Sequence, residues 1–380
     1  MKILHICLAA HYTEGMAYQD NQLPDQNFKD GHDVLVVSDC YKYENGELVK
    51  VPEEDKVLDS GVRLIRLEYD FIINKTISAK VRKVTKLKEL LEQEKPDVIL
   101  FHGVAGWELL TVANYKKNNP KTKLYLDSHQ DLYNSGTFFI SLFFQYRIFN
   151  RYIVSRIRKH VDKVLYISLD SRDFLMKIYG FSEEELEFYP LGGNIVDEDM
   201  KKCLSKSVRK SNGYTCDDII IVHSGKLSKS KKTNELIEAF SSVSSERLKL
   251  IIIGSIPKEE TAILDPLISA DKRISFLGWK TSSELVKYLC AADLYFQPGT
   301  QSATMQNAIC CGTPIALYPY KSHEPYLKNN GFYVSCKSDY VEVFEKVLSN
   351  PNILKKMSLE SYSIARKLLD YKLLASRLYY

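Results

Sequence analysis

Short apolar runs alternate along the chain with longer stretches in which apolar residues recur every three or four positions. In the first half, the runs DVLVV (33–37) and DVILF (97–101) have the length and composition of buried strands. Residues 78–94 carry an apolar stripe with helical spacing. We predict strands in this half over residues 3–8, 33–37, 62–67, 97–101, 123–126 and 164–168.

The turn sequence YPLGGN (189–194) and a polar stretch reaching about residue 218 interrupt this alternation, which then starts again. Apolar strands separated by helices are typical of a parallel sheet covered on both faces. The sequence therefore predicts an α/β fold with two doubly wound, Rossmann-like domains facing a central cleft. In the second half we expect strands over residues 219–223, 248–253, 274–276, 294–296, 314–317 and 332–334.

A chain of 380 residues is long enough for two domains. We expect an N-terminal domain over residues 1–191, a linker over 192–216 and a C-terminal domain over 217–363. Residues 364–380 are expected to form a C-terminal helix, and packing of that helix back on the N-terminal domain is one arrangement considered.

Composition narrows the class of protein. The chain is 45% hydrophobic and 26% charged, with a net charge of +4, which fits a globular protein and is too weak a charge to indicate a nucleic-acid partner. The eight cysteines include no Cys-x-x-Cys pair, so we expect reduced thiols in a cytoplasmic protein. The start, MKILHICLAA, is interpreted as a first buried strand in preference to a signal peptide.

Four lysines cluster in the segment HSGKLSKSKKTNELIEAF (223–240), after a strand expected to end at His223 and before a helix. Lysines at the carboxyl end of a strand are suited to holding a diphosphate, because each ammonium is a compact point charge. A solvated lysine-rich loop is the alternative. The lysines are Lys226, Lys229, Lys231 and Lys232.

A second segment, PGTQSATMQNAICCGTPIA (298–316), combines a Pro-Gly turn with an expected helix over 303–311 that stops at Gly312. Ser302 is placed to cap the amino terminus of that helix. A helix amino terminus offers free N–H groups to an anion, so this segment favours a phosphate site. A capped core helix without a ligand is the alternative.

These two segments, in this order, resemble the nucleotide-sugar half of the GT-B glycosyltransferases, in the large retaining (family 4-like) group that builds bacterial polysaccharides. ISFLGWKTSSELVKYLCAADLYFQPG (274–299) is similar to the block that lines the base pocket in that family, and YPLGGN to the start of its linker. In the first half, GHDVLVVS (31–38) and PDVILFHG (96–103) resemble its second and fourth strands, and DSHQD (127–131) its His-bearing loop.

The resemblance implies roles for individual residues. The family carries two glutamates around its phosphate-facing loop; here the second falls on Asn307, and the first has no acidic counterpart and maps to Gln301 or Ser302. The first loop, HYTEGMAYQDN (11–21), lacks the usual Gly pair and offers polar side chains, Gln19 and Asn21 among them, in its place. The implied catalytic residues are His129, Lys226 and Lys231; the donor-binding residues Gly15, Gly225, Gly278, Gln301, Ser302, Ala303, Thr304, Gln306 and Asn307; the acceptor-side residues Tyr18, Asp127 and Asp131.

The function implied is sugar transfer from a nucleoside-diphosphate sugar to a hydroxyl of a glycan or lipid-linked acceptor, with retention and without a metal cofactor. If the reaction inverts, Asp131 or His129 is the candidate general base. A metal site at Asp127, His129 and Asp131, and a structural role for His129, are weaker alternatives. The rival functions are a non-catalytic GT-B-like scaffold and a nucleotide-sugar epimerase or hydrolase.

The run FFISLFFQYRIFNRYIVSRIRKH (138–160) holds five cations and no acidic residue. The helix expected over 75–95 adds further lysines. Basic and aromatic side chains together suit the headgroup region of an anionic leaflet. The run favours peripheral contact at the inner face of the cell membrane over the alternative of an interior helix.

Overall fold

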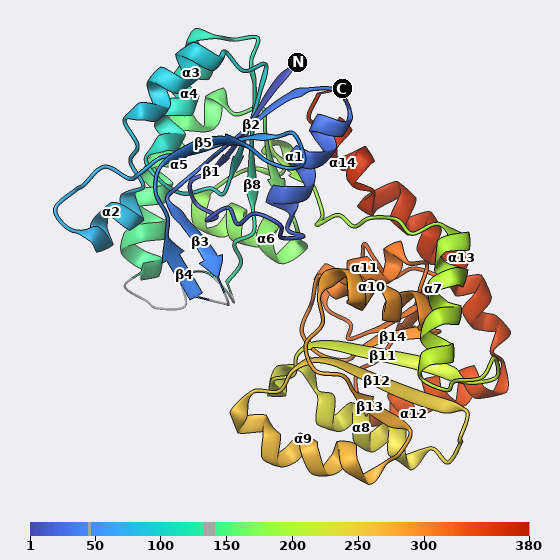
Figure 1. Ribbon diagram of the computed structural model, residues 1–380. Helices are drawn as coiled ribbons and strands as arrows, with labels where there is room; N and C mark the ends of the chain where they lie inside the picture. The colour runs from blue at the N-terminus through green and yellow to red at the C-terminus, as the bar shows by residue number, and fades with distance from the viewer. Residues whose placement is uncertain (45–46, 133–134, 136–140, 380) are drawn as a thin grey trace. The chain divides into compact units, whose positions relative to one another are not determined.

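The computed structural model describes residues 1–44, 47–132, 135 and 141–379, and the chain divides into two compact units. The N-terminal unit is Met1–Pro190 together with Leu374–Tyr380, and the C-terminal unit is Leu191–Leu373. Each unit holds one mainly parallel sheet with helices on both faces (Figure 1). The α/β class with two parallel sheets, predicted from the apolar runs, is confirmed.

The sheet of the N-terminal unit has the strand order β10-β9-β8-β7-β1-β2-β6-β5, in which only β5 is antiparallel to its neighbour. A separate hairpin, β3 with β4, was not expected from the sequence. The strands are β1 (Lys2–Cys7), β2 (Asp33–Ser38), β3 (Tyr41–Glu44), β4 (Glu47–Lys50), β5 (Glu54–Val57), β6 (Arg63–Arg66), β7 (Val98–His102), β8 (Lys123–Ser128), β9 (Lys163–Tyr166) and β10 (Leu186–Phe188).

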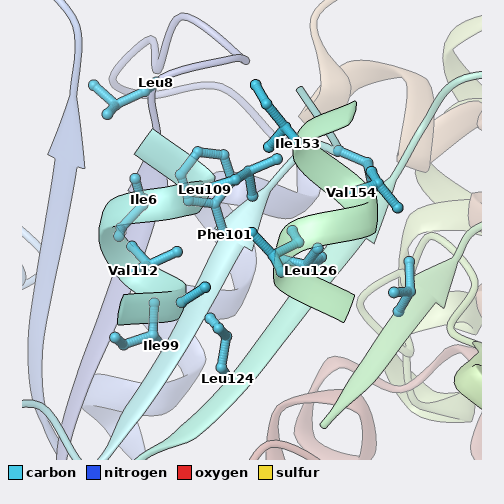
Figure 2. Packing of buried hydrophobic residues seen from close by; sticks show 14 of the residues in the cluster. Ile6, Leu8, Ile99, Phe101, Leu109, Val112, Leu124, Leu126, Ile153 and Val154 are labelled. Atoms are coloured by element: carbon cyan, nitrogen blue, oxygen red, sulfur yellow. The ribbon is translucent and has the colours of Figure 1, made fainter. Parts of the chain in front are cut away.

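Two helices of this unit pack their apolar side chains on one face of β1, β7 and β8. Figure 2 shows Leu109 and Val112 on one helix and Ile153 and Val154 on the other, facing Phe101 and its neighbours. The helical segments are α1 (Gln19–Lys29), α2 (Lys75–Val81), α3 (Lys86–Glu94), α4 (Glu108–Asn118), η1 (Ser141–Asn150, a π-helix), α5 (Arg151–Ile157), η2 (Arg158–His160), α6 (Leu169–Phe174), η3 (Leu175–Tyr179) and η4 (Glu183–Glu185).

The single helix predicted over 78–94 is wrong. The chain forms α2 and α3, separated at Arg82, which adopts a left-handed backbone with φ of 55°. The break is stabilised by tertiary contacts: the Trp107 N–H donates to the Val81 carbonyl at 2.7 Å, and the Val84 N–H donates to Glu108 Oε1 at 2.9 Å. These hydrogen-bond partners lie at the start of α4. The apolar spacing within 78–94 could not have indicated them.

The sheet of the C-terminal unit is entirely parallel, in the order β13-β12-β11-β14-β15-β16. Every strand expected from the second half is present, with ends that differ by at most three residues. The strands are β11 (Ile219–Lys226), β12 (Leu248–Ser255), β13 (Ile274–Phe276), β14 (Leu294–Gln297), β15 (Ile315–Leu317) and β16 (Gly331–Tyr333).

Helices cover both faces of this sheet, with α7, α10 and α11 on one face and α8, α9 and α12 on the other (Figure 1). The core on the second face includes Leu236, Phe240 and Phe344. The helical segments are α7 (Glu198–Ser211), η5 (Lys229–Lys231), α8 (Thr233–Ser242), α9 (Lys258–Ala270), α10 (Ser282–Ala291), α11 (Thr304–Cys310), η6 (Lys321–His323), α12 (Lys337–Ser349), α13 (Asn352–Ile364), η7 (Ala365–Leu369) and α14 (Tyr371–Ser376).

The segment 192–216, expected to be a linker, is helical over α7, which packs on α10 and belongs to the C-terminal unit. Its polar composition reflects a helix with one buried residue, Val208, and a wide exposed face. The chain end returns to the N-terminal unit from Leu374 onward. There the Tyr189 hydroxyl donates to the Leu374 carbonyl at 2.6 Å, and Arg377 forms an ion pair with Glu187.

All eight cysteines are free thiols. Five of them are buried and three are exposed, and the buried ones lie among apolar side chains of the two units. Across residues 1–44, 47–132 and 141–379, no helix combines the length and the apolar character needed to cross a membrane.

Candidate functional site

Two glycines shape the carboxyl ends of β11 and β12 in the C-terminal unit. Gly225 and Gly254 have φ values of +134° and +145°, which side chains rarely tolerate. A Cβ atom on Gly254 would lie 1.8 Å from the Gly225 carbonyl oxygen. The two strand ends therefore approach so closely that only glycine fits at position 254. Gly225 was a predicted donor-binding residue, whereas Gly254 was missed, although a glycine at a strand end is its visible signal.

Lys226 is the last residue of β11, because the strand runs three residues past His223, where the sequence pattern placed its end. Its side chain is exposed, and no hydrogen bond or ion pair is recorded for it within the described part of the chain. His223 itself is buried: its Nδ1 lies 2.8 Å from the Phe296 carbonyl and its Nε2 lies 2.9 Å from Thr233 Oγ1. The Lys226 ammonium is therefore available to a ligand, whereas His223, three residues earlier, has a structural role.

Lys231 is buried, with 8% of its surface exposed, and lies in η5. Its Nζ donates to the main-chain oxygens of Thr300 at 2.7 Å and Gln301 at 3.0 Å. Burial lowers the pKa of this ammonium from 10.5 to about 8. The alternative of a solvated lysine-rich loop is therefore wrong for Lys231, whose ammonium holds the main chain of the next loop.

The loop that follows β14 packs directly on η5. A Cβ on Gly299 would lie 2.2 Å from the Ser230 carbonyl oxygen and 2.6 Å from the Lys231 Cα, so only glycine fits there. The Thr300 N–H donates to that same Ser230 carbonyl at 3.1 Å. The two segments singled out from the sequence, 223–240 and 298–316, therefore meet at one edge of the sheet.

A buried polar chain supports this loop from below. The Tyr295 hydroxyl donates to Gln297 Oε1 at 3.0 Å and lies 3.2 Å from Ser224 Oγ. Gln297 in turn donates through Nε2 to the Thr300 carbonyl at 2.7 Å. Sequence reasoning missed Tyr295 and Gln297, which look like ordinary strand residues until the fold aligns them under the loop.

The helix expected over 303–311 begins one residue later, at Thr304, and Ser302 is not its cap in the expected sense. Ala303 occupies the cap position with a helical backbone, and Ser302 Oγ accepts from the Thr304 N–H at 3.3 Å. Buried Gln306 orders this entry: oriented with its nitrogen toward the loop, it donates to the carbonyls of Ala303 at 3.1 Å and Ser302 at 3.2 Å. Its amide therefore holds the loop.

The other predicted donor-side residues lie around the same edge. Gly278, with φ of +66°, accepts a hydrogen bond at its carbonyl from the Gly254 N–H at 2.9 Å. Asn307 is half-buried on α11, where the chain at Gly193 packs against it closely. Of the remaining lysines of 223–240, Lys232 has its Nζ 4.6 Å from the centre of the Tyr318 ring and is turned away to the Ser335 carbonyl.

In the N-terminal unit, Asp127 ends β8 and is buried between histidines. His102 Nδ1 lies 2.6 Å from Asp127 Oδ2, and the Gly103 N–H donates to Oδ1 at 2.9 Å. His5 Nδ1 lies 3.1 Å from His102 Nε2, and the two rings are stacked. Burial, with His102 nearby, lowers the pKa of His5 to about 3, so His5 is neutral at pH 7. Despite burial, the histidines hold the pKa of Asp127 well below its usual range.

His129 follows this strand, with its Nε2 3.7 Å from Asp127 Oδ2 and 46% of its side chain exposed. Partial removal from solvent opposes the charged form, but Asp127, by charge and hydrogen bond, and Asp20 outweigh this effect and raise the pKa of His129. Burial raises the pKa of Asp20 itself, at the start of α1. Asp131 lies two residues on, half-buried, its carbonyl accepting from the Ser135 N–H at 3.0 Å. Sequence reasoning missed Asp20. The signal that could have found it is a carboxylate in the first turn of the first helix after β1.

The segment 11–21 leads into α1, and its last three residues form the first turn of that helix. Gly15 has φ of +74° and open space around it, and exposed Tyr18 stands at the amino terminus of α1. The expectation that Asn21 offers its amide to a ligand was wrong, because it is buried and donates to the Thr13 carbonyl at 2.9 Å. The buried Gln19 amide has no protein partner among the residues that the structure describes.

The predicted residues fall into two groups. Gly225, Lys226, Lys231, Gly278 and residues 301–304 share the carboxyl edge of the C-terminal sheet, while His129, Asp127, Asp131, Gly15 and Tyr18 lie at the carboxyl ends of β1 and β8 in the N-terminal unit. Within residues 1–44, 47–132 and 141–379, no three His, Cys, Asp or Glu side chains are grouped so as to hold a metal ion.

Two family models match the chain: one for glycosyl transferases group 1 over residues 205–363, and one for glycosyltransferase family 4 over residues 28–195. No curated protein sequence matches it. The fold is similar to that of Anabaena Alr3699/HepE in complex with UDP, with a TM-score of 0.69, 15% identity, and coverage of 99% of this chain and 98% of that one.

Two further solved structures show the same likeness. Sucrose-phosphate synthase from Thermosynechococcus elongatus has a TM-score of 0.67 at 15% identity, covering 99% of this chain and 96% of its own. WaaG, a glycosyltransferase involved in lipopolysaccharide biosynthesis, has a TM-score of 0.62 at 16% identity, with 99% of each chain covered. At these identities the structures establish the shared fold.

Proposed function

The chain belongs to the GT-B glycosyltransferases, and from that premise we propose that it transfers a sugar from a nucleoside-diphosphate sugar to an acceptor hydroxyl, with retention of anomeric configuration. The glycan or lipid-linked acceptor would belong to the synthesis of a bacterial cell-surface polysaccharide. The observation that carries the proposal is the meeting of Lys226 and Lys231 with the loop 299–304 at one sheet edge.

Departure of the diphosphate is the step that these residues would stabilise. Lys226 offers an exposed ammonium with no competing protein partner recorded among the described residues. The Lys231 side chain passes Gly225, the residue before Lys226, since a Cβ on Gly225 would lie 3.5 Å from the Lys231 Cε. Preorganised charge aimed at a developing anion lowers the barrier without reorganisation during the reaction. We therefore assign both lysines to the leaving group and propose that a divalent metal is not needed there.

The donor residues of the loop and of α11 would bind through their main chain as well as their side chains. Gln301, Ser302, Ala303 and Thr304 form a turn whose N–H groups precede the first bonds of α11, and Gln306 holds that turn from inside. Asn307 has no carboxylate, so its amide would replace a charged acceptor with a neutral donor and acceptor. This change favours a donor sugar nucleotide whose hydroxyls can be bound by a neutral amide.

On the acceptor side, we propose that His129 contacts the transferred sugar and that Asp127 orients it. Asp127 is fixed by His102 and the Gly103 N–H, so its position is set before any substrate binds. Asp20 lies close enough to His129 for their charges to interact, so it adds a second carboxylate to the group around this histidine. Tyr18 and Asp131 remain proposed acceptor contacts from the adjoining loops.

The solved relatives support the substrate class. HepE was crystallised with UDP and with UDP-glucose, and WaaG is involved in lipopolysaccharide biosynthesis. We infer a nucleoside-diphosphate sugar for this chain because it has cations in the place where a diphosphate needs them. A cytoplasmic location follows from this proposal, since nucleotide sugars are the donors.

We also propose peripheral contact with an anionic membrane through η1 and α5. One face of this segment packs inward through Ile153 and Ile157, as an interior helix would. The other exposes Phe144 at 62% and Tyr152 at 51% together with Arg151. Basic and aromatic side chains on one exposed face suit a leaflet of anionic headgroups. Residues 138–140 of the original run lie outside the described residues.

Product analysis tests the proposal. Purified protein is given a panel of nucleotide sugars, first for thermal stabilisation and then for turnover with and without a hydroxyl acceptor. We expect transfer to the acceptor with the same anomeric configuration in the product as in the donor sugar. NMR coupling constants measure that configuration. Donor hydrolysis or epimerisation that needs no acceptor would assign the rival enzyme functions, and a protein that binds no nucleotide sugar would contradict the donor site.

A further inference from the structure

A second recess lies at the opposite edge of the C-terminal sheet from the proposed donor site. It is a groove of about 1060 Å³ between α7 and α13, which Figure 1 shows beside each other. Ile219, Asp293 and Pro314 line it, and these residues stand at the amino-terminal ends of β11, β14 and β15. The donor residues stand at the carboxyl ends of the same strands, so the two recesses are separate.

The lining of this groove is strongly basic, with seven lysine and arginine side chains against four carboxylates. Two of the carboxylates are already engaged. Asp293 pairs with Arg209 at 2.7 Å, and Asp218 accepts from the Thr215 N–H at 2.6 Å. Four lysines of the lining have no acidic partner within the described residues: Lys201, Lys206, Lys210 and Lys355.

Lys201 is the central one of these four. Its Nζ donates to the Gly312 carbonyl at 2.8 Å and to Ser358 Oγ at 3.4 Å, both neutral groups. Burial lowers the pKa of this ammonium, although Asp293 and Glu198 act in the opposite direction. Lys201 is half-buried and its hydrogen bonds go to neutral groups, so a bound anion would stabilise its charge.

The wall beside Lys201 holds an independent sign of a missing partner. Tyr362 lines the groove with 3% of its surface exposed, and its hydroxyl has no hydrogen-bond partner among the residues described. The Lys201 Nζ lies 5.7 Å from the centre of the Tyr362 ring. Buried hydroxyls are normally hydrogen-bonded, so this one leaves a donor unused in the wall of the groove. Tyr214, on the opposite lining, adds an aromatic ring.

We propose that this groove binds a small phosphorylated molecule with two or more negative charges, at a site distinct from that of the donor diphosphate. Lys201 is its central contact, Lys206 and Lys355 are the cations at its mouth, and Tyr362 forms part of the wall beside Lys201. A free phosphate ester and the phosphate headgroup of a lipid share this chemistry. The recessed position of Lys201 favours the free molecule.

Calorimetric titration with inorganic pyrophosphate tests the site. To keep the donor site silent, the titration is done in the Lys226→Met protein and repeated in the full wild-type chain. Binding should persist in Lys226→Met, and adding Lys201→Met should raise the dissociation constant by about tenfold to a hundredfold, the usual effect of losing one charged hydrogen bond. Lys272→Met, which removes an exposed cation of the same unit outside the groove, should leave the affinity unchanged.

Several outcomes overturn the proposal. Pyrophosphate binding that is lost in Lys226→Met would place all of it at the donor site, and an unchanged affinity in Lys201→Met would exclude the groove. If Lys201→Met does not fold, the pair Lys206→Met and Lys355→Met, both exposed, must weaken binding by the same measure, or the idea fails. Binding of these variants to phosphatidylglycerol vesicles should equal that of the wild type; loss there, with no pyrophosphate effect, would assign the groove to a lipid surface instead.

Discussion

The Lys231 ammonium donates to the main-chain oxygen of Thr300 at 2.7 Å and so joins η5 to the loop that precedes α11. One side chain therefore positions the loop and supplies positive charge to the proposed diphosphate site. Lys226, five residues earlier, has only the second of these tasks. The two lysines, which the sequence presented as equivalent, differ in what their removal should do.

Replacing Lys231 with Met should lower both the transfer rate and the stability. The variant loses the hydrogen bonds to Thr300 and Gln301, which takes the Lys231 donor from the Gln301 carbonyl and leaves the Thr300 carbonyl with Gln297 alone, and should cost about 1–3 kcal/mol in the free energy of unfolding. Urea denaturation and initial-rate measurements give the two numbers. A variant with wild-type stability would show that the loop is held by other contacts.

Replacing Lys226 with Met should lower the transfer rate alone. The side chain is exposed, so the free energy of unfolding should change by about 0.5 kcal/mol or less. Losing one preorganised charge at the leaving group typically costs ~10²–10³ in rate. Lys229→Met, which removes an exposed lysine of η5 from the same loop, is the matched control and should keep the wild-type rate. Equal rates for all three proteins would misplace the donor site.

Donor affinity should fall as the pH rises through about 8. The pKa of Lys231 in the free protein is about 8, because burial disfavours the charge, and a bound diphosphate favours the charged form. Above pH 8, binding must take up a proton, so the dissociation constant should rise by up to about tenfold per pH unit. Calorimetry between pH 7 and 9.5 measures this slope, which Lys231→Met should flatten.

The same pKa fixes the sign of the effect on stability. The pKa of Lys231 is lower in the folded state than the ordinary 10.5, so between about pH 8 and 10.5 the unfolded chain binds more protons. The contribution of Lys231 to the free energy of unfolding therefore increases across that window in the ligand-free protein. Urea denaturation of the wild type and Lys231→Met at several pH values measures it. A difference between the two proteins that stays constant across the window would mean that the ammonium is solvated.

Replacing Gly299 with Ala should disturb the site more than replacing Gly278. A Cβ on Gly299 would lie 2.2 Å from the Ser230 carbonyl oxygen, so the loop must move away from Lys231 at a cost of about 1–3 kcal/mol. Gly278 has open space around it and only a left-handed backbone, which costs an alanine about 1 kcal/mol. Nucleotide affinity should fall in Gly299→Ala and hold in Gly278→Ala; the reverse order would reject the loop contact.

Replacing Arg147, Arg151 and Arg156 with Ser should remove most binding to phosphatidylglycerol vesicles. Each cation near an anionic surface contributes about 1 kcal/mol, so the partition coefficient should fall on the order of 100-fold. Vesicle sedimentation measures it. A control with three exposed lysines of the C-terminal unit changed to Ser, Lys272, Lys287 and Lys356, has the same net charge and should bind as the wild type. Equal losses in both variants would reduce the effect to net charge.

The sequence predicted the parts of the molecule that rest on local patterns. Short apolar runs with helical stretches between them indicated all six strands of the C-terminal sheet and six of the eight strands of the N-terminal sheet, where β5 and β10 were missed. The family suggested by the motifs of 223–240 and 298–316 is confirmed. The glycines at strand ends could be recognised in part: Gly225 belongs to a motif, while Gly254 depends on how closely β12 approaches its neighbour.

Local patterns were misleading where a distant segment decides the structure. The helix predicted over 78–94 breaks at Arg82, where hydrogen bonds to the start of α4 replace those within a helix. The polar segment 192–216 contains the helix α7, which packs on α10. In both cases the contacting segment is distant in the sequence, so the hydrophobic periodicity of the segment itself gives no information about it.

By itself, the sequence determined the alternation of strands and helices in both halves and the residue types at the phosphate-facing edge, because burial and turn formation act over a few neighbouring residues. Only the tertiary structure decided which lysine is buried, since that depends on the approach of Thr300 and Gln301 to a side chain about seventy residues away along the chain. The same holds for Asp127, whose ionisation is set by His102 from another strand. Hydrogen bonds and charges act across space, so their pairing exists only once the sheets have formed.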